Sequence, residues 1–379
     1  MANSADFILK NALEVGKDTK VTLGTINAGV TGYSLANASY DSVSFSVAAQ
    51  DTAPAGLFFK PDGLKMYVVG LAGDDVNEYN LSTAWDVSTA SYLQNFSVAA
   101  QETSPYDIFF KPDGTKMYIV GSVGDDVNEY NLSTAWDVSS ASYVQVFSVS
   151  AQDTDPIGLF FKPDGLKMYV VGNAGQDINE YNLSTAWNVS TASYLQNFSV
   201  AAQDSSPAGL FFKPDGLKMY VVGNAQDEIN EYSLSTAWDI STASFVQVFS
   251  VAAQDSSPIG LFFKSDGTKM YVVGNTGQDV NQYSTVSYNN EVSLSTGNYF
   301  AETLAGNTTY TFSNAGAVQA FQMEITGAST YTITWPASVE WPFNGTAPEV
   351  PDAGETDIYT FVTDDGGTSY IGLLTADAV

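Results

Sequence analysis

The chain has 379 residues, enough for two or three domains, and its 42 acidic and 13 basic residues give a formal net charge of −29. Such a charge repels nucleic acid and anionic membrane surfaces, so we expect neither as a partner. The sequence has no cysteine or histidine and all its basic residues are lysines, which excludes a disulfide framework, thiolate metal ligands and catalytic triads built on histidine.

The N-terminal segment, residues 1–35, shares no repeat with the rest of the chain. We interpret it as a leader that packs with the C-terminal part. It lacks a basic stretch followed by an apolar one, so no standard signal peptide is predicted. No apolar run reaches the length of about 18 residues that a transmembrane helix needs, and membrane insertion is not expected.

A repeat of 51 residues runs from about Tyr40 to Tyr283. Three residue types keep this step, each at its own position in the unit. They are Pro54, Pro105, Pro156, Pro207 and Pro258; Phe45, Phe96, Phe147, Phe198 and Phe249; and Trp85, Trp136, Trp187 and Trp238. Because three residue types recur at the same spacing of 51 residues, the sequence indicates a repeat array.

Each unit contains four strand-like segments, which in the first unit are 56–60, 65–70, 76–81 and 92–98. Pro61-Asp62-Gly63 forms a tight turn between the first two, because proline presets φ and glycine accepts a positive φ. The first two segments are apolar on both sides, as in strands buried on both faces, and the later two are more polar. Four short strands in such a unit predict one propeller blade.

The two ends of the array complement each other. The fifth unit ends at Tyr283 without a fourth strand, whereas Ala38–Val47, ahead of the first unit, matches the fourth strand Ala90–Val98 with one residue inserted. Pairing these two ends would remove two open sheet edges. We therefore predict an all-β fold in which residues 36–285 form a five-bladed β-propeller closed by an N-terminal strand. An open solenoid is the alternative.

The segment Phe59-Lys-Pro-Asp-Gly-Leu-Lys-Met-Tyr-Val68 resembles the hairpin of lactonase-like and related bacterial propellers. That motif specifies a blade and implies no activity. Five-bladed rings also occur among sugar-binding lectins, which is an analogy of fold only.

Residues 286–379 are predicted to form an antiparallel β-sandwich. Strand-like segments with alternating polarity are separated there by glycine and asparagine turns. These segments are Asn307–Phe312, Ala320–Ile325, Thr330–Trp335, Asp357–Val362 and Ser369–Leu373.

The same part of the chain resembles a terminal domain of tailed-bacteriophage tail-fibre and virion proteins. The resemblance is carried by Leu294–Phe300, Asn307–Asn314, Ile333–Pro342 and Asp357–Tyr370, and the opening Phe7–Val21 is similar to the leaders of such proteins. In those relatives the leader runs straight into the segment that starts here at Leu294. The resemblance therefore implies a virion protein into which a propeller has been inserted.

Catalysis requires residue types that this chain mostly lacks. A carboxylate pair for glycoside hydrolysis remains available, but the acidic residues repeat from blade to blade, and a catalytic pair normally breaks a repeat's symmetry. No blade-specific pair stands out. We therefore predict that the chain is not an enzyme, that it has no catalytic residues and that it uses no cofactor.

The loops Gln50–Pro54 and Leu71–Asp75, with their equivalents in the other blades, share one face of the predicted ring, which we call the outward face. The tight turns flanked by Lys60 and Lys65 lie on the opposite, lysine-flanked face, where the chain also enters and leaves. Because the blades differ most on the outward face, we predict that it binds a ligand; sequence drift between the blades is the alternative explanation. The candidate residues are Asp74, Asp75, Asp125, Asp126, Asn173, Asp177, Asn224, Asp227, Asn275 and Asp279.

Two alternative roles concern repeated residues. The acidic loops could bind Ca²⁺, but the ordered pattern of a calcium loop is absent, and solvated carboxylates are the favoured interpretation. The tryptophans of the repeat could stack on sugars, but packing between blades is favoured. The tyrosines in the doubly apolar strands are expected in the core.

The function predicted from these features is that of a bacteriophage virion structural protein, a tail fibre or spike whose propeller displays a host-recognition face. It would assemble in the host's bacterial cytoplasm, contact other virion proteins through its non-repeat domain, bind a host surface glycan or receptor, and form a homo-oligomer. The alternatives are a capsid head fibre or decoration protein, or a bacterial cell-surface lectin or adhesin.

Overall fold

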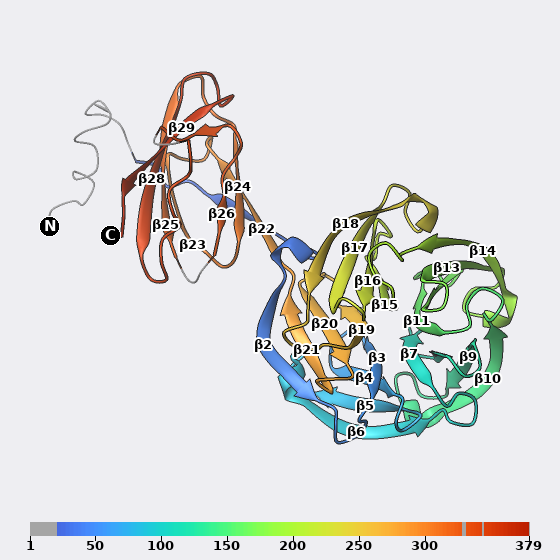
Figure 1. Cartoon of the computed structure of the whole chain (residues 1–379). Coiled ribbons are helices and arrows are strands. Elements are labelled where there is room, and N and C mark those ends of the chain that lie inside the picture. Colours follow the sequence, from blue (N-terminus) through green and yellow to red (C-terminus); the bar gives the residue numbers. More distant parts are fainter. Residues whose placement is uncertain (1–20, 328–330, 343–344, 379) are drawn as a thin grey trace. The chain divides into compact units, whose positions relative to one another are not determined.

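The computed structural model describes residues 21–327, 331–342 and 345–378, and the chain divides into two compact units (Figure 1). One is Gly32–Thr285, and the other combines the described part of residues 1–31 with residues from Val286 onward. Helical structure in the described chain consists of short 3-10 turns, namely Leu35–Asn37 (η2), Val87–Thr89 (η3), Val138–Ser140 (η4), Val189–Thr191 (η5) and Ile240–Thr242 (η6). None of these helices could cross a membrane.

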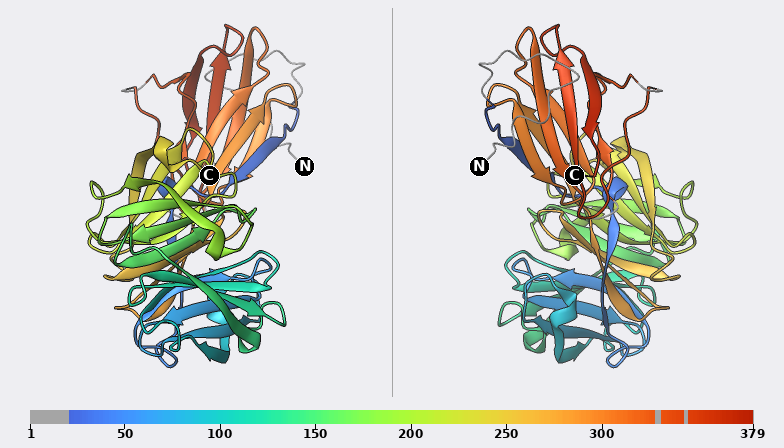
Figure 2. Two further views of the ribbon diagram at one scale, coloured as in Figure 1. Left: turned by 90° about the vertical axis from the view of Figure 1, so that its right-hand side faces the viewer. Right: turned by 90° about the vertical axis from the view of Figure 1, so that its left-hand side faces the viewer.

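The unit Gly32–Thr285 forms five four-stranded antiparallel sheets arranged as the blades of a propeller (Figures 1 and 2). The first blade contains β3 (Pro54–Phe59), β4 (Lys65–Gly70), β5 (Asp75–Leu81) and β6 (Ala90–Ser97). The next three repeat it as β7 (Pro105–Phe110), β8 (Lys116–Gly121), β9 (Asp126–Leu132) and β10 (Ala141–Ser148); β11 (Pro156–Phe161), β12 (Lys167–Gly172), β13 (Asp177–Leu183) and β14 (Ala192–Ser199); and β15 (Pro207–Phe212), β16 (Lys218–Gly223), β17 (Glu228–Leu234) and β18 (Ala243–Ser250). The five-bladed arrangement predicted from the repeat is confirmed.

The fifth blade takes its strands from both ends of the repeat region. Its sheet has the order β19 (Pro258–Phe263), β20 (Lys269–Gly274), β21 (Asp279–Ser284) and β2 (Ser39–Ser46). β2 and β21 are antiparallel, with Tyr40 opposite Tyr283 and Phe45 opposite Val280. A register shift after Tyr40 accommodates the additional residue in this strand, and Ser42 there has a φ of 58°.

The inner strands of each blade are buried on both faces. Every residue of β3 is buried, and so is all of β4 except Lys65. Burial instead alternates along the outermost strand β6, as the change from apolar to mixed sequence predicts. The propeller core therefore lies between blades, where the apolar inner strands of neighbouring sheets meet.

Each of the first four blades buries one glutamate beside a lysine. Glu78 is 0% exposed and is ion-paired with Lys65. It also accepts hydrogen bonds from Gln94 Nε2 at 2.9 Å and from the backbone N–H of Val138, in the second blade's loop, at 3.1 Å. The equivalent pairs are Lys116–Glu129, Lys167–Glu180 and Lys218–Glu231.

In the fifth blade the carboxylate that pairs with the lysine comes from a different strand. Gln282 occupies the position of the glutamate, and Lys269 instead forms an ion pair of 2.5 Å with Asp41 on β2. Asp41 also accepts hydrogen bonds from Gln282 Nε2 at 2.9 Å and from Ser284 Oγ at 2.6 Å. The N-terminal strand thus supplies the carboxylate that the other blades carry on their third strand.

The repeated tryptophans pack between blades. Trp136 is 8% exposed, its ring covers Gly114, and its backbone carbonyl accepts a hydrogen bond of 2.8 Å from the hydroxyl of Tyr67 in the preceding blade. Gly114 has a φ of +72°, and the indole leaves no room for a Cβ there, so glycine is required. The buried position of the tyrosines, predicted from the doubly apolar strands, is confirmed at Tyr67, which is 0% exposed.

In the fifth blade Tyr33 takes the place of the tryptophan. Its φ is 64°, close to the 65° of Trp136, and its ring covers Gly267. Its backbone carbonyl accepts a hydrogen bond of 2.8 Å from the Tyr220 hydroxyl. The segment ahead of β2 thus repeats both the packing and the hydrogen bonding of the inter-blade tryptophan loops.

The second unit contains two mixed sheets. One has the order β1 (Ile26–Thr31), β22 (Ser287–Ser293), β24 (Thr308–Ser313) and β26 (Ile333–Thr334); the other has the order β23 (Tyr299–Thr303), β25 (Gln319–Thr326), β28 (Thr356–Thr363), β29 (Tyr370–Ala376) and β27 (Val339–Glu340). The prediction of an antiparallel arrangement was wrong in part, because β22–β24, β24–β26, β23–β25 and β27–β29 are parallel pairs. Alternating polarity identifies a strand's buried face but not the direction of its neighbour.

Candidate functional site at the propeller axis

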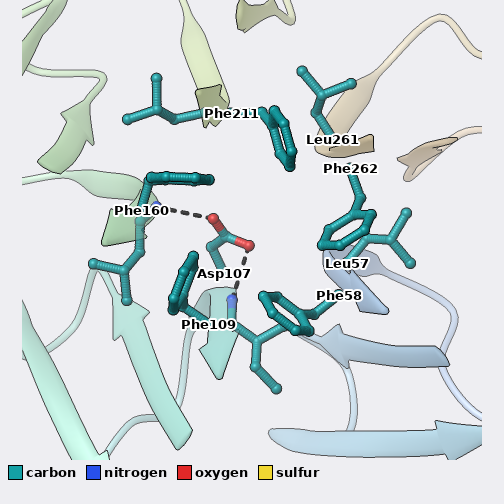
Figure 3. Close-up of a pocket in the computed structure, with 11 residues that line it drawn as sticks. Leu57, Phe58, Asp107, Phe109, Phe160, Phe211, Leu261 and Phe262 are labelled. Carbon is teal, nitrogen blue, oxygen red and sulfur yellow. Dashed lines mark hydrogen bonds between the residues drawn. The ribbon is translucent and has the colours of Figure 1, made fainter. Parts of the chain in front are cut away.

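Five phenylalanines, one from the innermost strand of each blade, meet around the propeller axis (Figure 3). They are Phe58, Phe109, Phe160, Phe211 and Phe262. Each ring touches the next edge to face, with centroid distances of 5.3, 5.2, 5.4, 5.6 and 5.1 Å around the circle. This is the preferred geometry of aromatic pairs, so the five rings form a closed apolar layer across the axis.

Asp107 breaks the symmetry of this layer. It lies two residues before Phe109, at a position where the other blades have glycine: Gly56, Gly158, Gly209 and Gly260. Its side chain points toward the centre of the phenyl ring circle in Figure 3. One carboxylate oxygen accepts a hydrogen bond of 2.8 Å from the N–H of Ile108, and the other accepts one of 2.9 Å from the N–H of Leu159 in the next blade.

The surroundings of Asp107 are apolar. Apart from Asp107 itself, the pocket is lined by the five phenylalanines and by Leu57, Ile108, Leu159, Leu210 and Leu261, and its volume is about 10 Å³. Asp107 is 8% exposed, and burial raises the pKa of its carboxyl group to about 7 against the two backbone hydrogen bonds, which lower it. A carboxyl group with this pKa can hold or release a proton near neutral pH, or pair with a cation.

The predicted residues of the outward face fall into three groups. Asp74, Asp125 and Asp227 are partly exposed at the tips of turns, with φ values of 48°, 48° and 55°. Asp75 and Asp177 are buried at the start of strands, and Asp126 and Asp279, which are partly buried, hold the same position. Each of these four carboxylates accepts a hydrogen bond from an asparagine two residues later, namely Asn77, Asn179, Asn128 and Asn281.

The third group consists of asparagines that hold neighbouring loops together. The side chain of Asn173 donates to Asp155 at 2.8 Å, and that of Asn224 donates to Ser257 Oγ at 3.2 Å. Asn275 donates its backbone N–H to the carbonyl of Ser257 at 3.0 Å. The structure therefore leaves Asp74, Asp125 and Asp227 as the more accessible acidic members of the predicted set.

A further acidic residue of each blade was not singled out from the sequence. It lies in the loop ahead of the first strand and is at most 3% exposed; the five members are Asp51, Glu102, Asp153, Asp204 and Asp255. Asp51 accepts hydrogen bonds from the N–H groups of Ala53 at 2.6 Å and Gly73 at 2.8 Å, which join two loops of the outward face. Across the described residues no group of three or more carboxylates has an arrangement that could hold a metal ion.

Asp107 is the site residue that sequence reasoning missed. The signal was present, because one aspartate replaces four glycines at the same position of an otherwise regular repeat. It was missed because glycoside hydrolysis needs a pair of carboxylates, and Asp107 is a single one. In a strand buried on both faces, a single carboxylate is already exceptional.

Comparison with known proteins finds distant structural likenesses to the propeller. No protein family and no curated protein matches the sequence. Similar solved structures include a 6-phosphogluconolactonase candidate from Bacteroides uniformis, with 15% identity, a TM-score of 0.38, and coverage of 58% of this chain and 64% of that one. A protein of unknown function from Desulfotomaculum acetoxidans has 18% identity, a TM-score of 0.40 and coverages of 60% and 67%. The periplasmic gluconolactonase of Pseudomonas aeruginosa has 15% identity and a TM-score of 0.35, and the match covers 52% of this chain and 54% of that one.

The propeller of this chain thus resembles 6-phosphogluconolactonase-like propellers. These likenesses also contradict the prediction that the chain is not an enzyme, because the structural neighbours include lactonases. That prediction rested on missing residue types and on symmetry, and Asp107 shows that the symmetry is broken. At such identities the likeness shows the fold alone, and it transfers no reaction to this chain.

Proposed function

We propose that the chain is a structural protein of a bacteriophage virion, a tail fibre or spike whose propeller displays a host-recognition face. The observation that carries the proposal is the pairing of β1 with β22. Residues Ile26–Thr31 lie antiparallel to Ser287–Val292 in continuous register, with Thr31 opposite Ser287. In the sequence, the propeller thus stands between two strands that pair with each other in the other unit, in the manner of a domain inserted into an existing module.

The segments that resemble phage virion proteins contribute to one core. Leu294 and Phe300, Tyr310 and Phe312, Trp335 and Trp341, and Phe361 and Tyr370 belong to the same apolar cluster. The phenyl ring of Phe312 contacts Phe361 and Tyr370 at centroid distances of 5.0 and 5.1 Å. This supports the proposal that the two sheets pack as a sandwich and form a single module, which would anchor the protein to other virion proteins.

We further infer that β2 closes the propeller ring. The support is its pairing with β21, the ion pair between Asp41 and Lys269, and the packing of Tyr33 over Gly267. A closed ring leaves no inter-blade face open at the first or last unit. It also gives the inserted domain a rigid frame for the loops that it displays.

The outward face is proposed as the reading face because the chain joins the propeller on the other side. Within the propeller, Tyr33 donates its backbone N–H to Gly267 at 2.7 Å, and Thr285 donates to Thr268 at 3.1 Å. Both ends therefore lie beside the turn 265–268, on the lysine-flanked face. The loops that carry Asp74, Asp125 and Asp227 are on the opposite face of the propeller.

Immunogold electron microscopy tests the assignment to a virion. An antibody raised against the full-length chain should label particles purified from bacteria that carry the gene, at the tail tip or along a fibre. Label on the capsid would instead favour the head-fibre alternative. Unlabelled particles, together with label on the bacterial surface, would support an adhesin and refute the virion proposal.

Adsorption of the full-length protein to bacteria tests the outward face. Because an acidic face is repelled by an anionic cell envelope, and salt shortens the Debye length to roughly 8 Å near 0.15 M, adsorption should strengthen as ionic strength rises. The combined variant Asp74→Asn, Asp125→Asn and Asp227→Asn should adsorb more tightly at low salt and depend less on salt. Flow cytometry of labelled protein on a panel of strains measures both effects.

The matched control neutralises three carboxylates on the lysine-flanked face, in the combined variant Asp62→Asn, Asp113→Asn and Asp215→Asn. It changes the net charge equally but should leave the salt dependence of adsorption nearly unchanged. Equal effects of both variants would mean that net charge, not the outward face, governs adsorption. Adsorption that weakens steadily as salt rises would also contradict the proposal.

A further inference from the structure

We propose that the axial pocket at Asp107 binds one primary ammonium group. The proposal rests on the structure of the pocket and does not depend on the virion assignment. It names a single site for each chain, because the other four blades have glycine where the second blade has Asp107.

Among the residues that the structure describes, none that lines the pocket is a counter-ion for the carboxylate of Asp107. The side chains that line the pocket with it are leucine, isoleucine and phenylalanine, none of which titrates or carries a charge. Its partners are two backbone N–H groups, one on each oxygen. A carboxylate offers about four acceptor positions, so each oxygen can still accept a hydrogen bond from a bound cation.

The size of the pocket restricts what can enter. Its volume of about 10 Å³ is close to that of a single water-sized probe. An ammonium group is about as large as water, so this volume can take the charged tip of an alkylamine but not its alkyl part.

Other ligand classes match the pocket less well. Divalent Ca²⁺ requires six to eight oxygen ligands, whereas this pocket supplies one carboxylate among hydrocarbon side chains. An anion would be repelled by Asp107 and by the net charge of −29. A quaternary ammonium has no N–H to donate and is larger than the space available. A primary ammonium satisfies charge, hydrogen bonding and size together.

The chain itself offers a matched variant. Asp107→Gly restores the residue that the other four blades carry at this position, and Asp107→Asn keeps the side-chain size while removing the charge. We would titrate the full-length protein at pH 8 with methylammonium and follow the amide resonances of Ile108 and Leu159 by NMR. The wild-type resonances should shift and saturate, and in both variants the affinity should fall at least tenfold.

Parallel titrations identify the ligand chemistry. Tetramethylammonium and Ca²⁺ should produce no saturable shift at these two amides. Capped lysine should bind like methylammonium, and its Nε-acetyl form should not, which would extend the site to lysine side chains of a protein. If lysine fails while methylammonium binds, the pocket takes free small amines only.

Two results would overturn the proposal. One is a wild-type protein whose Ile108 and Leu159 amides do not respond to methylammonium up to a concentration of about 0.1 M, which corresponds to less than about 1.4 kcal/mol of binding. The other is an equal response in Asp107→Gly. Thermal unfolding of both variants shows whether they are folded, and a folded variant that binds as the wild type does would exclude a role for the carboxylate.

Discussion

Removal of residues 1–47 should lower the melting temperature of the protein by at least about 10 °C or leave it aggregated. The deletion takes away β2 and exposes the edge of β21, which invites pairing with other chains. It also removes Tyr33, Leu35 and Val47, which are 4%, 3% and 0% exposed. Each such side chain stabilises by roughly 1.5–3 kcal/mol, and 1 kcal/mol corresponds to about 2–4 °C in a domain of this size.

A shorter deletion, of residues 1–31, is the matched control. It removes β1 from the second unit but keeps Tyr33, Asp41 and all of β2, so the difference between the two deletions reports the propeller. Hydrogen exchange at Val280 and Gln282, whose strand pairs with β2, adds a local measurement. If both deletions melt at the same temperature and protect these amides equally, β2 does not hold the ring closed.

The charge of the fifth blade explains why this strand pairs where it does. Lys269 is 31% exposed, and removal of β2 would leave it without Asp41, because Gln282 is neutral. In the other blades the lysine finds its glutamate within its own hairpin. Because Lys269 and Asp41 are 31% and 14% exposed, their ion pair is only partly buried, and it favours a partner strand that brings a carboxylate by a modest amount.

The sequence predicted the propeller well because a repeat is a strong long-range signal. Residues that recur every 51 positions must occupy equivalent environments, so the strand limits of one blade apply to all. Strand β4, at Lys65–Gly70, was predicted at its observed limits, and β5 begins one residue earlier than expected, at Asp75. That one residue matters, since it places Asp75 in a strand beside Asn77 and not in an open loop.

The second unit was harder to predict because it has no repeat. Its strands were located by alternating polarity, and β25 and β28 lie within one residue of the predicted segments. Which strands pair, and in which direction, depends on contacts between distant residues such as Phe312 and Phe361. A single sequence contains no direct signal for such pairs, and the parallel strands were therefore missed.

The candidate site was missed for a different reason. The outward loops vary most between blades and were therefore predicted as the site. The substitution of glycine by Asp107 lies inside a strand and was not considered. Asp107 is distinctive because a strand buried on both faces rarely contains a carboxylate. In this repeat protein, the position at which one blade departs from the others in charge indicates a candidate site that variation among the loop residues does not.

The substitution Asp107→Asn should change how stability depends on pH. Burial raises the pKa of Asp107 to about 7 in the folded protein, from its ordinary value of 3.8. Between these pH values the unfolded chain has released the proton that the folded chain still holds, so wild-type stability falls as pH rises from about 4 to about 7. Asparagine does not titrate, and the variant lacks this loss, which amounts to at most about 4 kcal/mol.

The quantity to measure is the difference in free energy of unfolding between variant and wild type, by urea denaturation at pH 5 and at pH 8. Asparagine cannot accept hydrogen bonds from both Ile108 and Leu159, which gives a constant offset of about 1–3 kcal/mol at either pH. The difference should nevertheless move in favour of the variant by at least about 1 kcal/mol between pH 5 and pH 8. Other groups titrate in both proteins and cancel.

Asp113→Asn is the matched control, because hydrogen bonds from Lys111 and Thr115 outweigh desolvation and lower the pKa of Asp113 to about 2. Its stabilising effect is present above about pH 4 and is lost only in stronger acid, so its difference from wild type should be the same at pH 5 and pH 8. If Asp107→Asn behaves like this control, Asp107 is already ionised throughout the range. The pocket would then have to be open enough for water to solvate the carboxylate, and burial at the axis would not be what sets its chemistry.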